Sequence, residues 1–263
     1  MKIAILGTGN LGYSIAIGIL SQDNFKFKNL YLTKRNTESL EPWSKLPNVK
    51  ISTENKRAVR FSDVIIIAVQ PKQLHSVLEE IKDLIKPKHT IISVVTGREI
   101  EEIESVLGND VAIIRSMPNT AISVGQSMTC LSANSRGKKN IELAKKIFNS
   151  LGQTMCIEEN LMQAATVICA SGIAFWMRLI RATTQGAVQL GFDAKEAQEL
   201  SMQTALGAAS LLIKSGNHPE QEIDKVTTPS GCTIEGLNEM EHQGLSSSLI
   251  RGLVTSFEKI NQI

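Results

Sequence analysis

A glycine-rich loop near the N-terminus constrains the fold of this chain more than any other feature. Residues Gly7-Thr8-Gly9-Asn10-Leu11-Gly12 spell GxGxxG between an apolar run, Lys2–Leu6, and a helical pattern, Leu11–Leu20. In this setting the first glycine permits a tight turn, the second lets the backbone approach a pyrophosphate, and the third lets the helix pack on the strand. Unpaired N–H groups at the helix start favour an anion. A ligand-free turn is the alternative, but the loop's position favours a dinucleotide site.

The first 158 residues alternate short apolar runs with polar helical stretches. Several of the apolar runs are rich in Ile and Val and are continuous rather than alternating, which is typical of strands buried on both faces of a parallel sheet. We predict strands at Lys2–Leu6, Leu30–Thr33, Val49–Ser52, Val64–Val69, Thr90–Val95 and Val111–Arg115. We predict helices at Leu11–Leu20, Lys72–Ile85 and Glu99–Leu107, and an extension of the sheet through Met128–Leu131, Gly137–Leu151 and Thr154–Ile157. The fold class is therefore α/β, with a Rossmann-type doubly wound domain over residues 1–158.

The character of the chain changes from residue 159 onward. Segments Leu161–Leu190 and Ala194–Ser215 combine Ala, Leu, Met and Ile at helical spacing, with apolar residues nearly all round. A helix that is apolar on all sides must be covered on all sides, and a helical domain of about a hundred residues could not easily cover both. We therefore predict an all-helical dimerisation domain over residues 159–263, in a homodimer or higher homo-oligomer.

Composition excludes several other classes of protein. The 28 Lys and Arg residues nearly balance the 26 Asp and Glu residues, so the chain is not a strongly basic nucleic-acid binder. The N-terminal apolar run ends at Gly7, and Val64–Val69 is far shorter than the ~20 residues that cross a bilayer. The four cysteines form no CxxC pair and the histidines show no metal-ligand spacing. We expect a cytoplasmic protein with no membrane segment and no metal.

The end of the second predicted strand carries information about the cofactor. An NAD site places an acidic residue about 20 residues after the glycine loop, where it binds the ribose 2′-hydroxyl. Here the segment reads Thr33-Lys34-Arg35-Asn36 and contains no carboxylate. Two cations suit a 2′-phosphate, which an aspartate would repel. NADP(H) is the favoured cofactor, and a solvated basic turn is the alternative.

Three further segments resemble the pyrroline-5-carboxylate reductase family. They are Asp63–Lys72, with the sequence DVIIIAVQPK; Arg115-Ser116-Met117-Pro118-Asn119-Thr120; and a C-terminal region in which His218-Pro219 and Asp224 precede Val226–Ile234, VTTPSGCTI. The matches run in order over nearly the whole chain, and the C-terminal one is the most specific. The resemblance implies a Rossmann domain and a helical domain that intertwines with a partner.

The same resemblance implies an activity and a set of residues. The activity would be NAD(P)H-dependent reduction of 1-pyrroline-5-carboxylate, a cyclic imino acid, to L-proline, the last step of proline biosynthesis. The implied cofactor-binding residues are Leu6, Gly7, Thr8, Gly9, Asn10, Leu11, Gly12, Thr33, Lys34, Arg35, Asn36, Asn55, Val69, Gln70, Pro71 and Lys72. The implied substrate-binding residues are Ser171, Gly231, Cys232 and Thr233.

Thr233 is the candidate catalytic residue. Imine reduction needs a hydride at carbon and a tolerated positive charge on nitrogen, and a hydroxyl near that nitrogen could orient the ring and relay a proton. Thr233 precedes a helical pattern at Ile234–His242, so it could instead be a helix N-cap, and the two roles are compatible. Backbone N–H groups of Gly231, Cys232 and Thr233 could hold the substrate carboxylate.

Some positions depart from the family pattern. The long helix of the family often begins Ser-Gly-Ser-Gly-Pro-Ala-Tyr, whereas Cys169–Phe175 reads Cys-Ala-Ser-Gly-Ile-Ala-Phe. Ser230 replaces the first of two usual glycines, and Glu222 replaces an aliphatic residue. Two alternatives therefore stay open: a related NADP-dependent imine or 2-hydroxyacid reductase, and a non-catalytic NADP-sensing protein. The absence of Lys from Ala164–Trp176 disfavours a hydroxyacid enzyme, because those enzymes commonly use a lysine there.

Overall fold

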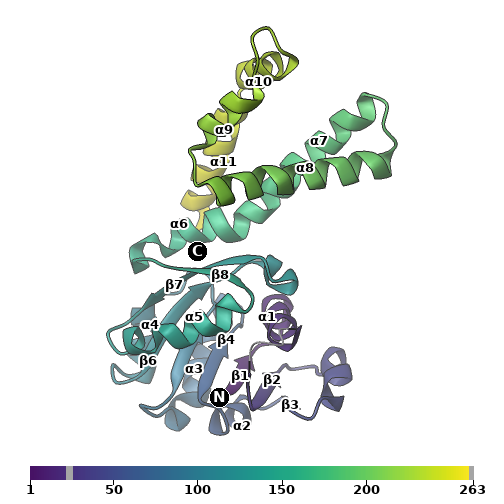
Figure 1. The fold of residues 1–263 in the computed structure, drawn as a ribbon. Coiled ribbons are helices and arrows are strands. Elements are labelled where there is room, and N and C mark those ends of the chain that lie inside the picture. Colours follow the sequence, from purple (N-terminus) through teal and green to yellow (C-terminus); the bar gives the residue numbers. More distant parts are fainter. Residues whose placement is uncertain (22–25, 261–263) are drawn as a thin grey trace. The chain divides into compact units, whose positions relative to one another are not determined.

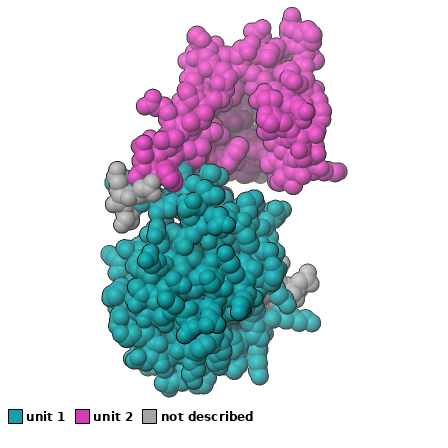
Figure 2. Space-filling view, turned by 90° about the vertical axis from the view of Figure 1, so that its left-hand side faces the viewer, with its two compact units in different colours: residues 1–170, 259–263 teal, residues 171–258 magenta. Residues whose placement is uncertain are grey.

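The structure is a computed structural model that describes residues 1–21 and 26–260. The chain folds into two compact units (Figure 2). The first contains Met1–Ala170 with Lys259 and Ile260, and the second contains Ser171–Glu258. The predicted domain division at residue 158 precedes this change, because Met162 and Ala165 pack with Met117 and Cys130 of the first unit.

The first unit is built on an eight-stranded sheet, ordered β3-β2-β1-β4-β5-β6-β7-β8 in the described residues (Figure 1). The strands are β1 Lys2–Leu6, β2 Asn29–Thr33, β3 Val49–Ser52, β4 Val64–Ile67, β5 Thr90–Ser93, β6 Ala112–Met117, β7 Ser127–Ala133 and β8 Gly152–Cys156. All neighbouring pairs are parallel except β6 and β7. The strand order reverses between β1 and β4, which is the position where open α/β sheets bind ligands. The Rossmann prediction is confirmed.

Helices cover both faces of this sheet. They are α1 Asn10–Ser21, α2 Asn55–Arg60, α3 Leu74–Ile81, α4 Ile100–Leu107 and α5 Ile141–Asn149. Short 3₁₀ segments occupy Glu38–Lys45, Pro71–Gln73, Lys82–Leu84, Thr120–Val124, Gly137–Asn140 and Glu159–Leu161. Helices α1 and α5 pack on one face, and α2, α3 and α4 pack on the other. Because strand side chains alternate, Ile3 and Ile5 enter the first core while Ala4 and Leu6 enter the second.

Two predicted strands and one predicted helix are shorter in the structure. The predicted strands Val64–Val69 and Thr90–Val95 end at Ile67 and Ser93. The neighbouring strand β1 ends at Leu6, where the chain turns away at Gly7. One backbone bond continues the ladder beyond each shortened strand, from Ala68 N to Leu6 O at 2.8 Å and from Val94 N to Ile67 O at 3.0 Å. The predicted helix Lys72–Ile85 is divided into α3 and the 3₁₀ turns on either side of it.

The described residues of the second unit form helices and the turns that connect them. It contains α7 Gly172–Gln189, α8 Ala194–Ser215, α9 Pro219–Val226, α10 Cys232–His242 and most of α11 Leu245–Ile260. Helices α7 and α8 form a long hairpin (Figure 1). The carboxylate of Asp193 caps α8 by accepting from the backbone N of Lys195 at 2.8 Å and of Glu196 at 3.0 Å. The helix predicted at Ala194–Ser215 is confirmed at both ends.

The long helix predicted at Leu161–Leu190 has an irregular start. It consists of α6 Met162–Ala165, a π-helical segment at Thr166–Ser171, and then α7. By length and composition, the continuous helical stretch Glu159–Gln189 is long and apolar enough to cross a bilayer. Only 22% of its most apolar 18-residue segment is buried in the single chain. Arg178 and Arg181 lie within α7. The stretch therefore carries an apolar surface that needs a cover.

Candidate functional site

A cleft of about 740 Å³ opens at the carboxyl ends of β1, β2 and β4. It is formed by the glycine loop, the end of β2, the start of α2, the loop after β4 and one face of α3. Its lining includes the predicted residues Gly7, Thr8, Gly9, Thr33, Lys34, Arg35, Asn36, Asn55, Val69, Gln70 and Lys72. Residues from four separate segments of the sequence thus line one cleft.

The glycine loop has the geometry that its sequence predicts. Gly7 has a φ of +88°, and a Cβ there would lie 2.6 Å from Val69 Cγ1. A Cβ on Gly12 would lie 2.5 Å from the carbonyl oxygen of Gly7, so helix α1 packs directly against the loop. Gly9 is open, because a Cβ there would have no heavy atom of the described residues within 4 Å beyond its chain neighbours. The loop therefore leaves its outer face free for an anion at the start of α1.

Thr8 gives an independent sign that the cleft fits a phosphate. Its side chain is fully buried, and its Oγ1 has no hydrogen-bond partner among the described residues. A buried hydroxyl without a partner costs free energy, roughly 1–3 kcal/mol. A phosphate oxygen in the cleft would satisfy it. The donor set of the loop thus suits a dinucleotide.

The turn after β2 presents two cations to the cleft. Lys34 and Arg35 both line it, and Lys34 Nζ donates to Ser39 Oγ at 2.8 Å. Asn36 also bonds within the turn, since its Nδ2 donates to Glu38 Oε2 and its Oδ1 accepts from Glu38 N. The positive charge at this end of the cleft suits a 2′-phosphate better than a bare ribose.

Five predicted cofactor residues do not line the cleft. Leu6 is buried in the core of the sheet, and Gly12 serves the packing of α1 rather than a ligand. Asn10, Leu11 and Pro71 are also absent from the lining. The structure adds six residues that the prediction missed, namely Thr53, Ala68, Gln73, Ser76, Val77 and Glu80. The positions Gln73, Ser76, Val77 and Glu80 have the spacing of one helix face, a signal the sequence did contain.

A hydrogen-bonded chain of side chains crosses the floor of the cleft. Thr33 Oγ1 lies 3.3 Å from the backbone N of Gly7 and 2.7 Å from Asn55 Oδ1. Asn55 Nδ2 donates to Glu80 Oε2 at 2.8 Å. The glycine loop, β2, α2 and α3 are therefore linked through polar side chains as well as through the core.

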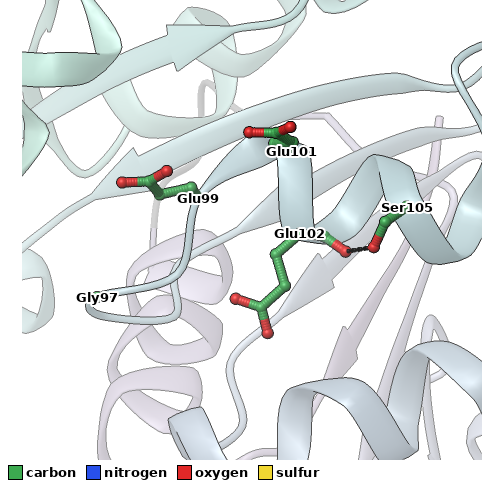
Figure 3. Close-up of a pocket in the computed structure, with 5 residues that line it drawn as sticks. All are labelled: Gly97, Glu99, Glu101, Glu102 and Ser105. Atoms are coloured by element: carbon green, nitrogen blue, oxygen red, sulfur yellow. Dashed lines mark hydrogen bonds between the residues drawn. The ribbon is translucent and has the colours of Figure 1, made fainter.

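A second, smaller hollow of about 400 Å³ lies beside the start of α4 (Figure 3). Its lining contains Glu99, Glu101 and Glu102, and the Ser105 hydroxyl donates to the backbone carbonyl of Glu102 at 2.8 Å. Figure 3 shows that the three carboxylates do not point toward a common centre. Their charge would repel a phosphate-bearing cofactor. Within the described part of the chain, no three His, Cys, Asp or Glu side chains are arranged to hold a metal ion.

The Arg115–Thr120 motif lies away from the cleft lining and acts in packing. Arg115 is buried, and its Nη1 lies 3.3 Å from Glu159 Oε1. Asn119 caps the following 3₁₀ turn by accepting from Ala121 N at 2.9 Å, and its Nδ2 donates to the carbonyl of Cys169 at 3.0 Å. The motif thus ties the end of β6 to the π-helical segment.

Two cysteines meet where β7 packs on that segment. The sulfurs of Cys130 and Cys169 lie 4.0 Å apart. A hydrogen bond from the Cys130 thiol lowers the pKa of Cys169 to about 7, while the same contact and burial raise the pKa of Cys130. Cys169 is therefore the more readily ionised thiol of the pair.

The predicted substrate residues all lie in the second unit. Gly231 is the N-cap of α10 and Cys232 its first residue, so Thr233 lies inside the first turn. The interpretation of Thr233 as the N-cap is therefore wrong by two positions. The sequence signal misled because Gly is also a permitted cap, and here a Cβ at position 231 would collide with Thr228 Oγ1. Ser171 is the last residue of the π-helical segment.

Ser230 has an unusual backbone conformation in this loop. Its φ is +57°, and it is the single non-glycine residue with a positive φ among residues 1–21 and 26–260. This is the position where the resembled family usually has a glycine. The left-handed turn of the loop is therefore kept although its residue has changed.

Comparisons with known proteins agree with both units. Residues 159–263 match the family model described as pyrroline-5-carboxylate reductase dimerisation, and residues 2–97 match the one described as NADP oxidoreductase, coenzyme F420-dependent. The chain is 48% identical to pyrroline-5-carboxylate reductase 1 of Dictyostelium discoideum over 98% of its own length, although it spans only 49%, about half, of that relative. It is 43% identical to pyrroline-5-carboxylate reductase 2 of the same organism, covering 98% of this chain and 91% of the relative. A crystal structure of the Plasmodium falciparum pyrroline carboxylate reductase with NADP bound matches with 26% identity and a TM-score of 0.89, covering 100% of this chain and 97% of the other.

Proposed function

Because the chain belongs to the pyrroline-5-carboxylate reductase family, we infer that it reduces 1-pyrroline-5-carboxylate to L-proline with NADP(H) as cofactor. The observation that carries this inference is the cleft at the switch point of the sheet, which joins an open glycine loop to a basic turn. The reaction is the last step of proline biosynthesis. A related imine or 2-hydroxyacid reductase and an NADP sensor are the competing activities.

The first unit supplies the cofactor site. When bound, NADPH delivers a hydride to the imine carbon. Backbone N–H groups at the start of α1 would hold the pyrophosphate, with the Thr8 hydroxyl as a further partner. The N–H groups of Gly7, Thr8 and Gly9 already donate within the protein and shape the loop around this position. Lys34 and Arg35 hold the 2′-phosphate through charge-assisted hydrogen bonds, so the chain prefers NADPH to NADH.

The second unit supplies the substrate residues in this proposal. Helix α10 has eleven residues, and the backbone N–H groups of Cys232 and Thr233 at its start suit the substrate carboxylate. The N–H of Gly231, which was also expected to contribute, donates instead to the carbonyl of Thr228 at 3.0 Å. The hydroxyl of Thr233 orients the ring nitrogen and relays a proton to it. Because Gly231 occupies the N-cap position, the Thr233 hydroxyl is not needed there. Ser171 at the start of α7 completes the proposed substrate set.

The helical unit forms a homodimer, or a higher assembly of dimers, in this proposal. Its family model is described as a dimerisation domain. The large apolar side chains Trp176, Leu211 and Ile213 are each more than half exposed in the single chain. A partner copy would cover them, and the two arginines of α7 favour this cover over a lipid bilayer.

The proposed setting is the cytoplasm, without nucleic acid or membrane partners. The four cysteines are free thiols, which suits a reducing compartment. The near-neutral net charge of +2 gives no general attraction to nucleic acid.

The test is oxidation of NADPH by the full-length protein with and without 1-pyrroline-5-carboxylate. We expect the absorbance of NADPH to fall only when 1-pyrroline-5-carboxylate is present. One L-proline should form for each NADPH oxidised. An NADP sensor would bind NADPH with no turnover. A hydroxyacid enzyme would oxidise NADPH with a 2-keto acid but not with the cyclic imine. Either of these results would reject the proposed activity.

A further inference from the structure

We propose that Glu80 is a positioning residue of the cofactor cleft, acting through Asn55 and Thr33. It fixes which end of the Asn55 amide faces the cofactor, and it sets the direction of the hydrogen bonds that hold the glycine loop. The proposal rests on NADP(H) binding in this cleft. It gives a role to a side chain on α3 that lies 25 positions along the chain from Asn55.

The direction of the hydrogen bonds follows from the chemistry of a carboxylate. An ionised Glu80 can only accept, so the end of Asn55 that lies 2.8 Å away must be the NH₂ group. The carbonyl Oδ1 of Asn55 then faces Thr33, 2.7 Å away, and the Thr33 hydroxyl must donate to it. A lone pair of Thr33 Oγ1 is left to accept from Gly7 N at 3.3 Å. One carboxylate thus orders three successive hydrogen bonds.

This order matters because its inner end is buried. The Thr33 side chain is only 2% exposed, and its neighbour Thr8 donates its backbone N–H to the Thr33 carbonyl at 2.8 Å. If the Asn55 amide turned over, its Oδ1 would face the Glu80 carboxylate, which puts two acceptors together, and the Thr33 hydroxyl could donate only to the carbonyl of Ile5, 3.5 Å away. The hydroxyl that accepts from Gly7 N would then exchange its 2.7 Å bond to Asn55 for this longer one, which weakens the support of the glycine loop.

The cofactor side of Asn55 is set in the same way. With one N–H held by Glu80 and Oδ1 held by Thr33, the remaining group of the amide is its second N–H. That group is a donor, and the groups it would meet in NADPH, ribose hydroxyls and phosphate oxygens, accept hydrogen bonds. Glu80 therefore keeps Asn55 in the state that suits the ligand.

The charge of Glu80 supports a positioning role over a direct one. A carboxylate that lines a cleft for a polyanion opposes binding by simple repulsion. Its neighbour Glu79 makes an ordinary surface ion pair with Lys82 at 2.7 Å and is absent from the lining. Glu79 therefore offers a matched control of equal charge on the same helix.

The experiment measures the Kd of NADPH by titration of the full-length protein, without the imine substrate. Glu80→Ala should raise Kd about 3- to 10-fold, the range for one lost hydrogen bond. In separate turnover assays with the imine, it should raise the KM for NADPH more than it lowers kcat. Glu80→Gln keeps an acceptor for Asn55 and should stay within about twofold of the parent protein. Glu79→Ala should leave Kd unchanged.

A double-mutant cycle decides whether Glu80 acts through Asn55. In an Asn55→Ala background, the added Glu80→Ala change should have almost no effect on Kd, because the residue it orients is gone. An equal loss in both backgrounds would overturn the proposal, as would unchanged or tighter NADPH binding by Glu80→Ala alone. Since the imine is absent from these titrations, failure of the proposed reductase activity would not alter their outcome.

Discussion

The two units of the chain bury their apolar residues in different ways. In the first unit both faces of the sheet are covered within the single chain, so that Ile3 on one face and Ile65 on the other are fully buried. In the second unit, α9, α10 and α11 have no buried side chain over their described residues, and Ile213 of α8 is 76% exposed. A sheet closed by helices on both faces completes its own core, whereas a hairpin of long helices leaves its apolar surface for a partner.

Separating the units gives the largest effect that we expect. A chain ending at Ala170 should fold as a monomer and still bind NADPH, because both sheet cores and the cleft lie within it. Residues 171–258 alone should not form a folded monomer. Light scattering and circular dichroism test both pieces. A full-length protein that remained a folded monomer at micromolar concentration would contradict the comparison.

The two tryptophans allow a finer test of the same contrast. Trp176 on α7 is 64% exposed, while Trp43 stacks on Tyr13 within the first unit with ring centroids 4.6 Å apart. Trp176→Ala should raise the dimer dissociation constant about 30-fold or more, since buried tryptophans are common hot spots at ~2 kcal/mol or above. Trp43→Ala should lower the melting temperature and leave the dissociation constant unchanged. Equal effects of the two changes on the dimer dissociation constant would contradict the proposal that Trp176 lies in the dimer interface.

Thr233→Ala should separate turnover from cofactor binding. We expect kcat/KM for the imine to fall about 10- to 100-fold, the range for losing one oriented hydrogen bond in the reacting complex. The Kd of NADPH should change little, because the cleft belongs to the other unit. Thr233→Ser should retain most activity. Full activity of Thr233→Ala would show that the Thr233 hydroxyl has no part in the reaction.

Arg35→Glu should weaken the use of NADPH without affecting the residues that hold the imine. Charge-assisted bonds to phosphate contribute about 1.5–3 kcal/mol each, so kcat/KM with NADPH should fall roughly tenfold or more while that with NADH changes little. The ratio of the two rates is the measurement. An equal loss with both cofactors would show that the turn after β2 does not bind the 2′-phosphate.

Ser230→Gly should give the smallest effect. The positive-φ residues described in the first unit are all glycines, whereas the second unit holds Ser230 at +57°. Glycine there should relieve backbone strain and raise the free energy of unfolding by about 0.5–1 kcal/mol in urea titrations at fixed protein concentration. The control, Ser256→Gly within α11, should lower it by roughly 0.5 kcal/mol. Destabilisation by Ser230→Gly would show that the serine side chain supports the loop.

Prediction from sequence succeeded where one short pattern determines one local structure. Continuous Ile and Val runs identified the sheet strands, and the glycine spacing identified the turn at Gly7 and the close packing at Gly12. It failed where the structure depends on how elements meet. The role of Glu80 requires α2 and α3 to be adjacent, which no local pattern in the sequence indicates. The π-helical segment at Thr166–Ser171 contains no Gly or Pro that would predict an irregular helix there. Thr233 was misplaced because several nearby residues could cap α10.

The packing at Gly12 limits how a site of this kind can change over evolution. Because a methyl group there would lie 2.5 Å from the Gly7 carbonyl, the loop and α1 behave as one inseparable part. A larger residue would displace the helix and carry its N–H donors away from the anion. New cofactor preferences must therefore arise at the exposed turn of Lys34 and Arg35, where side chains can be exchanged without moving the backbone. The site therefore combines a glycine loop in which position 12 tolerates no side chain with a turn whose side chains can be substituted during evolution.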